Sequence, residues 1–114
     1  MPLAISSRES GGVTILDLEG KLILGDETHQ LGDRIQQLLA QDKTKIVLHL
    51  GKVTFIDSAG VGTLVAAFTS ARARGGAIKL ANPTPKFQEA LQVTRMMTIF
   101  EVFNSEADAL ASFK

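Results

Sequence analysis

The chain has 114 residues, of which 45% are hydrophobic and 21% are charged, and its 12 basic and 12 acidic residues give a formal net charge of zero. This composition is typical of a folded soluble protein, and the length predicts one domain over residues 1–114. A balanced charge attracts neither nucleic acid nor an anionic membrane, and the lack of cysteine excludes disulfides and zinc–cysteine sites. No apolar run reaches the roughly eighteen residues of a membrane span and no signal peptide is recognisable, so we expect a cytoplasmic protein.

The N-terminal third predicts two strands and a helix. Residues 3–6 (LAIS) form a short candidate edge strand, and residues 13–20 (VTILDLEG) mix apolar with polar side chains in alternation and end at a glycine. From Glu27 the apolar spacing becomes that of a helix, for which Asp26 is the expected N-cap. An edge strand near the N-terminus leaves dimerisation open, so we expect a monomer or a weak dimer.

The middle of the sequence predicts a strand–helix–strand unit. Residues 45–50 (KIVLHL) are almost continuously apolar, which suits a central strand covered on both faces. Helical spacing and a high alanine content then predict a helix that stops at Gly75–Gly76. Residues 77–82 (AIKLAN) predict the next strand, and such a crossover implies that the two strands are parallel.

The C-terminal third predicts two further helices with an extended segment between them. Residues 84–93 (TPKFQEALQV) predict a helix with Pro85 in its first turn. Residues 97–103 (MTIFEVF) predict a short last strand or an extended segment. A terminal helix capped by Ser105 is expected to turn three residues inward: Ala107, Leu110 and Ala111.

This order of elements predicts an α/β fold, with a mixed sheet of about four to five strands packed with about four helices. Sites in such folds gather in the loops at the carboxyl ends of parallel strands, where residues 55–62 (FIDSAGVG) lie. Ser58 in this loop is either the N-cap of the next helix, worth about 1 kcal/mol, or a functional hydroxyl. A cap alone does not explain Gly60 and Gly62, since each costs on the order of 1 kcal/mol in a helix and bare backbone is useful where another molecule approaches.

Enzymatic interpretations of this loop fail on its local chemistry. A nucleophile elbow requires glycine where Ile56 stands, and a phosphate-binding P-loop requires a lysine that the loop lacks. A dinucleotide-binding fingerprint requires a third glycine where Val65 stands. His29 and His49 are the only histidines and have no neighbouring cluster in the sequence, so we predict no catalytic residue, no metal site and no cofactor.

Modification is the remaining functional interpretation of Ser58. A hydroxyl at a helix N-terminus, flanked by glycines, is accessible to a kinase, and phosphorylation adds a charge of roughly −1.5 to −2. The helix end tolerates an anion, because its free amides and its dipole favour negative charge. The modified domain is therefore expected to stay folded while the charge of its surface changes at one point.

The segment FIDSAGVGTL resembles the signature of the STAS domain, in particular that of the bacterial anti-sigma factor antagonists. The similarity extends through VTILDLEGKLILGDETHQL, KIVLHL and NPTPKFQEALQVT, and so spans essentially the whole chain. It implies that Ser58 is phosphorylated by a partner anti-sigma factor, itself a serine kinase of the GHKL ATP-binding type. It further implies that the unmodified protein holds this partner and frees sigma, that phosphorylation ends the hold, and that a PP2C-type phosphatase restores it. The matching partner-binding positions are Asp26, Asp57, Ser58, Ala59, Gly60, Val61 and Gly62.

The chain departs from this family pattern at two places. Many members have a Thr-Gly pair where this chain has Thr94-Arg95, followed by Met96 and Met97, and Asp26 follows Gly20 at a longer distance than the family pattern has. The alternative function is that of a STAS module without a sigma pathway, as a scaffold or a transporter-associated subunit that binds proteins. An independent enzyme is disfavoured, since no acid–base constellation is present.

Overall fold

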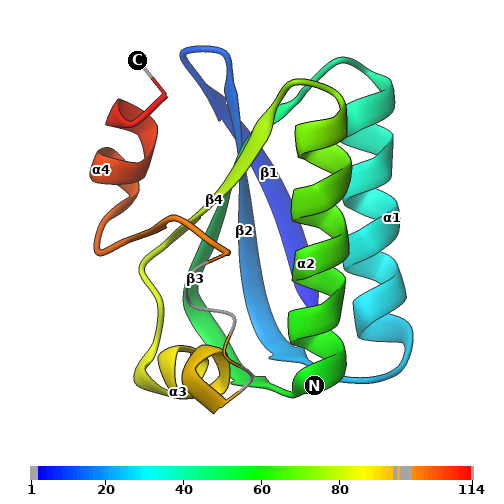
Figure 1. Ribbon diagram of the computed structural model, residues 1–114, viewed down its shortest axis with the longest axis vertical. Helices are drawn as coiled ribbons and strands as arrows, with labels where there is room; N and C mark the ends of the chain where they lie inside the picture. Colours follow the sequence, from blue (N-terminus) through cyan, green and yellow to red (C-terminus); the bar gives the residue numbers. More distant parts are fainter. Residues whose placement is uncertain (1–2, 94, 96–98, 114) are drawn as a thin grey trace.

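The computed structural model describes residues 3–93, 95 and 99–113 and shows a five-stranded sheet with helices on both of its faces (Figure 1). The strands are β1 (Ala4–Ser10), β2 (Val13–Leu22), β3 (Lys45–Ile56), β4 (Ala77–Ala81) and β5 (Val102–Phe103). The helices are α1 (Asp26–Ala40), α2 (Ser58–Ala73), α3 (Pro85–Val93) and α4 (Glu106–Ala111). The predicted α/β class and order of elements are confirmed.

The sheet is mixed, with strands in the order β1-β2-β3-β4-β5. β1 runs antiparallel to β2, whereas β2, β3, β4 and β5 are parallel to one another. β3 is longer than predicted, because it continues past Gly51 and ends at Ile56, which pairs with Leu22 at the end of β2. The carboxyl ends of β2 and β3 therefore lie side by side, and the chain leaves both toward helices of the same layer.

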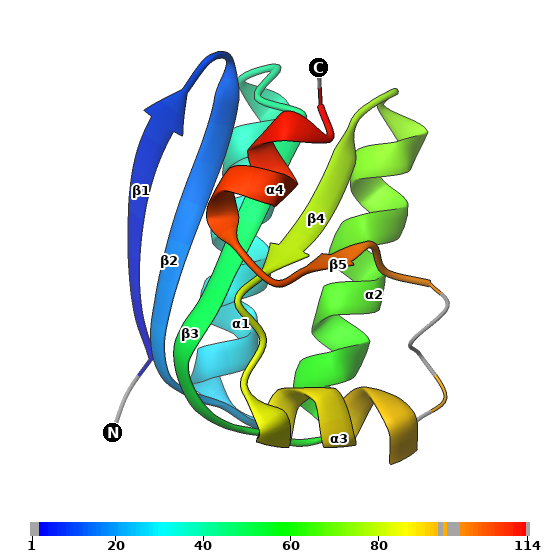
Figure 2. The ribbon, with the colours of Figure 1, turned by 90° about the vertical axis from the view of Figure 1, so that its left-hand side faces the viewer.

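The two faces of the sheet carry separate apolar clusters. Figure 2 shows α4 on one face of the sheet and α1 and α2 on the other. The main core lies under α1, α2 and α3 and contains fully buried residues of the central strands, such as Leu16, Leu48 and Leu80. The opposite face holds a smaller cluster of Val13, Ile15, Val47 and Ala81, on which α4 packs through Ala109. Val47 is completely buried, so the expectation that β3 is covered on both faces is confirmed.

Two details of the predicted helices are wrong. Asp26 is the first residue of α1 rather than its N-cap, since Gly25 holds the cap position with a φ of 134°, where a side chain would be strained. In α4, Ala109 is the buried residue and Ala107 and Ala111 are exposed, whereas Leu110 is half-buried and faces the sheet as predicted. Ser105 caps α4 as predicted, because its hydroxyl accepts a hydrogen bond from the backbone amide of Asp108 at 3.1 Å.

The segment that departs from the STAS pattern is described only at Arg95. This residue has a φ of 59°, so it adopts the left-handed conformation that glycine takes more easily, and its amide donates to the carbonyl of Gln92. The other departures, Thr94, Met96 and Met97, lie outside the described residues. In the described part of the chain, no helix has both the length and the apolarity that a membrane crossing requires.

Candidate functional site

The candidate site lies where β3 ends and α2 begins, and Asp57 organises it. Asp57 has extended backbone angles (φ −112°, ψ −175°) and is the N-cap of α2. One oxygen of its carboxylate accepts from the amide of Gly60 at 2.9 Å, and the other accepts from the amide of Leu24, in the β2–α1 loop, at 3.0 Å. Of the two alternatives for Ser58, that of the N-cap is therefore wrong, because Asp57 occupies that position.

The electrostatics of Asp57 follow from these hydrogen bonds. Partial burial acts to raise the pKa of its carboxyl, but the donated bonds from the amides of Leu24 and Gly60 outweigh that effect and hold the pKa below its usual value. Asp57 is therefore ionised at neutral pH. Its negative charge lies beside the positive end of the α2 dipole, where it is favourable.

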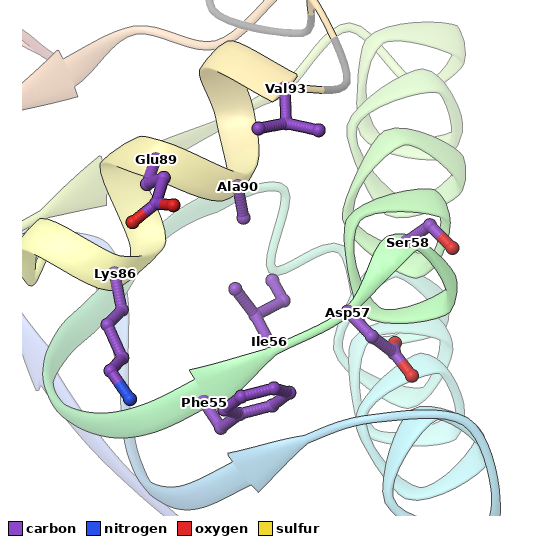
Figure 3. A pocket seen from close by; sticks show the side chains of 8 residues that line it. All are labelled: Phe55, Ile56, Asp57, Ser58, Lys86, Glu89, Ala90 and Val93. Atoms are coloured by element: carbon purple, nitrogen blue, oxygen red, sulfur yellow. The ribbon is translucent and has the colours of Figure 1, made fainter.

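Ser58 is the first residue of α2, and its side chain is exposed. Within the described part of the chain, no hydrogen bond engages its hydroxyl. Figure 3 shows this hydroxyl directed to the side of α2 that faces away from α3. The hydroxyl is thus free of a structural role at the start of a 16-residue helix.

Gly60 and Gly62 have different reasons to be glycine. Gly60 is buried, and a Cβ at this position would collide with the carbonyl oxygen of Leu22 and lie 2.8 Å from Cγ1 of Ile56. It therefore lets α2 pack closely against the end of β2, which corrects the expectation that its bare backbone receives another molecule. Gly62 is exposed, and a Cβ there would meet nothing within 4 Å, so the fold gives no reason for its helix-weakening glycine.

An apolar groove of about 410 Å³ adjoins Asp57 and Ser58 (Figure 3). Phe55 and Ile56 of β3 form one wall, and Lys86, Glu89, Ala90 and Val93 of α3 form the other. The Phe55 side chain is 47% exposed, Val93 is 76% exposed, and the Lys86 ammonium lies 5.6 Å from the centroid of the Phe55 ring.

Two exposed apolar side chains line this groove, and a third belongs to a residue whose backbone binds Asp57. The described residues include four exposed large hydrophobic residues: Leu24, Phe55, Val93 and Val102. The first three adjoin the site, since Phe55 and Val93 line the groove and the amide of Leu24 binds Asp57. A concentration of exposed apolar groups at one place is typical of a protein-binding surface.

The family model for the STAS domain matches residues 4–109. The chain belongs to the STAS domain family. It is 27% identical over 103 residues to BtrV, a candidate anti-sigma factor antagonist of Bordetella bronchiseptica, and this match covers 90% of the chain and 88% of BtrV.

Solved structures of STAS domains share this fold. A candidate anti-sigma factor antagonist from Thermotoga maritima is 24% identical with a TM-score of 0.88, and the match covers 95% of this chain and 92% of that one. The Bacillus cell fate determinant SpoIIAA in its phosphorylated form is 21% identical with a TM-score of 0.74, and the match covers 97% of this chain and all of that one.

The predicted partner-binding positions of this STAS domain are not equally accessible. Ser58 and Gly62 are exposed, Asp57 and Ala59 are half-buried, and Asp26 is exposed two residues after Leu24. Gly60 and Val61 are buried, so they have no surface that another protein could contact. Their role in the site is to pack the start of α2 against the rest of the fold.

Three exposed apolar residues at or beside the site were not predicted from the sequence: Leu24, Phe55 and Val93. The sequence does contain one indication that Leu24 is exposed. It precedes Gly25 in a loop, before the helical apolar pattern begins. His29 is exposed and His49 half-buried, neither lines the groove, and the described residues contain no group of three or more potential metal ligands.

Proposed function

We propose that this STAS domain is an anti-sigma factor antagonist. In its unphosphorylated form it binds an anti-sigma factor that is also a serine kinase of the GHKL type, and this binding releases sigma. Phosphorylation of Ser58 by the same partner ends the binding, and a PP2C-type phosphatase restores it. The protein acts by binding and carries no catalytic residue of its own.

The exposed and unbonded hydroxyl of Ser58 is the observation that carries this proposal. Because Asp57 already caps α2, the Ser58 hydroxyl has no structural bond that a kinase would have to break. The apolar groove lined by the exposed residues Phe55 and Val93 supports the proposal, since it provides a contact area for a partner next to the acceptor.

Charge explains how one modification would switch binding. A phosphate on Ser58 adds roughly −1.5 to −2 charges next to the ionised Asp57, and apolar or acidic partner groups would then face a strongly hydrated anion. Opposition of like charges at an interface costs several kcal/mol. Because each 1.4 kcal/mol changes affinity about tenfold, a single phosphate is sufficient for a switch.

Affinity capture from cells that contain the protein, followed by mass spectrometry of bound proteins and phosphosites, tests the proposed partner. A GHKL-type kinase in the eluate and a phosphate on Ser58 are expected. Scaffold or transporter subunits in its place would contradict the sigma pathway and support the alternative function.

Phosphorylation by the captured kinase then tests the site. Ser58→Ala is expected to take up no phosphate and to bind the kinase without regulation by ATP. Ser6→Ala is the matched control, because Ser6 is also an exposed serine and lies on strand β1, outside the groove. Equal phosphate incorporation by the wild-type protein and Ser58→Ala would refute the assignment of Ser58.

Ser58→Asp tests the electrostatic part of the proposal. It adds one negative charge where phosphoserine adds nearly two, so it is expected to weaken kinase binding less than authentic phosphorylation does. If neither form binds more weakly than the unmodified protein in titration calorimetry, charge at this position does not control the interaction.

A further inference from the structure

α4 covers one half of the sheet face that lies opposite α1 and α2 (Figure 2). Beneath it are Val13, Ile15, Val47 and Ala81, none of which is more than 4% exposed. The outward-facing residues farther along these strands are polar, such as Asp17 and His49. The apolar part of this face therefore coincides with the part that α4 covers.

α4 has few means of its own to stay in place. It contains six residues, of which Ala109 is buried and Leu110 is half-buried, and Phe113 after it also packs against the sheet. An isolated helix of this length does not form in water. At its N-terminal end, the Arg8 guanidinium pairs with Glu106 at 2.6 Å, but the Arg8 side chain is 49% exposed. Exposed ion pairs of this kind contribute little to stability.

Lys79 makes the strongest polar contacts at the other end of α4. It lies on β4. Among the described residues, it is the one charged residue that is classed as buried. Its ammonium donates to the hydroxyl of Ser112 at 2.8 Å and to the Ser112 carbonyl at 3.2 Å, and it pairs with Glu101 at 3.0 Å. It also lies 4.4 Å from the centroid of the Phe113 ring. Ser112 and Phe113 directly follow α4, so Lys79 fastens the end of this helix to the sheet.

We propose that α4 is a detachable cover that opens as a unit, and that Lys79 is the contact that controls its opening. None of the described residues of α4 belongs to the main core, so opening leaves that core packed. Opening exposes the apolar half-face of Val13, Ile15, Val47 and Ala81. This surface lies across the sheet from Ser58, so the cover goes beyond the proposed function and does not depend on it.

Hydrogen exchange on the intact chain tests the cover. The amides of Ala109, Ser112 and Phe113 donate to carbonyls within or beside α4, and we expect them to exchange faster than the amides of β3. Lys79→Met keeps the length of the side chain but removes its charged donors, and it should raise exchange in α4 by about tenfold or more. Lys52→Met is the control, because Lys52 is exposed on β3 and lies in a pocket formed with residues of β1 and β2.

Three results of the exchange experiment would contradict the proposal. Equal exchange rates for α4 and β3 in the wild-type protein would show that α4 opens only when the whole domain unfolds. Equal effects of Lys79→Met and Lys52→Met would remove Lys79 from the mechanism. Global unfolding of Lys79→Met would also overturn the proposal, because the control of a separate cover does not decide the stability of the main core.

Ala109→Asp provides a second test, because it places a charge on the buried contact of α4. We expect this variant to keep cooperative thermal unfolding and to bind the dye 1-anilinonaphthalene-8-sulfonate more strongly than the wild-type protein does. Loss of cooperative unfolding would show that α4 is an integral part of the domain. Unchanged dye binding would show that no apolar surface becomes exposed, and either result would overturn the proposal.

Discussion

Substitution of Gly62 by alanine separates the stability of α2 from its proposed use as a binding surface. Gly62 lies inside α2, is exposed, and has open space where a Cβ would stand. Alanine is about 1 kcal/mol more favourable than glycine in a helix interior, so Gly62→Ala should raise the free energy of unfolding by up to that amount. For a domain of this size, the corresponding increase in melting temperature is roughly 4 °C.

The same methyl group is expected to weaken binding of the proposed anti-sigma factor partner. Gly62 lies one helical turn after Ser58 on the exposed side of α2. If the partner packs against this bare backbone, an added methyl overpacks the interface at a cost of about 1–3 kcal/mol. Affinity should then fall roughly 5- to 150-fold, which titration calorimetry with the captured kinase can measure.

Two further glycine variants serve as controls for this experiment. Gly32→Ala makes the same change inside α1, also into open space, and should stabilise the protein without weakening binding. Gly60→Ala should destabilise the fold, since its methyl would collide with the carbonyl of Leu22. A Gly62→Ala variant that is more stable and binds as tightly as Gly32→Ala would refute the contact assigned to Gly62.

The remaining predictions concern caps, pH and a tight turn. Because Asp57 is the cap of α2, Asp57→Ala should lower the free energy of unfolding, measured by urea denaturation, by about 1–2 kcal/mol. Ser58→Ala should stay within about 0.5 kcal/mol of the wild type. A larger loss of stability for Ser58→Ala than for Asp57→Ala would contradict the hydrogen bonds described. Because the pKa of Asp57 is lower in the folded than in the unfolded state, its contribution is complete above its ordinary pKa and is lost as the pH falls through the folded value. The difference in unfolding free energy between wild type and Asp57→Ala should therefore shrink from about pH 5 to pH 3, and a constant difference would contradict the lowered pKa. Ser105→Ala should cost about 1 kcal/mol, and faster exchange confined to α4 would locate the effect there. Gly76→Ala should destabilise by more than this, since its methyl would collide with the carbonyl of Thr44, and unchanged melting would contradict that close approach.

The sequence was sufficient to predict the order of helices and strands, because apolar spacing is a local property of the chain. The change of period near Glu27 and the glycine stop at Gly75–Gly76 both correspond to observed element boundaries within one or two residues. The extent of β3 was underestimated, since Gly51 and Lys52 interrupt its apolar run, yet pairing with β2 continues the strand to Ile56.

The candidate site could be predicted only in part, because its details depend on contacts between distant segments. Asp57 and Ser58 are both good N-cap residues, and the choice between them is set by where β3 ends against β2. The need for glycine at position 60 comes from the carbonyl of Leu22, which lies far away in the sequence. The exposed apolar residues were not predicted, because periodicity places apolar side chains in the interior. Phe55 is an exception, since it is apolar and exposed.

The two hydrogen bonds to Asp57 have a consequence for the reversibility of the proposed phosphorylation of Ser58. The amides of Leu24 and Gly60, which would otherwise solvate an anion at this helix end, are already occupied by the carboxylate. A phosphoryl group on Ser58 would compete poorly with the Asp57 carboxylate for these two amides. Most of its oxygens would therefore be hydrated by water instead of bonded to the backbone. Such an ester is as easy for a hydrolase to reach as the bare alcohol is for a kinase, so neither direction of the cycle requires the domain to open.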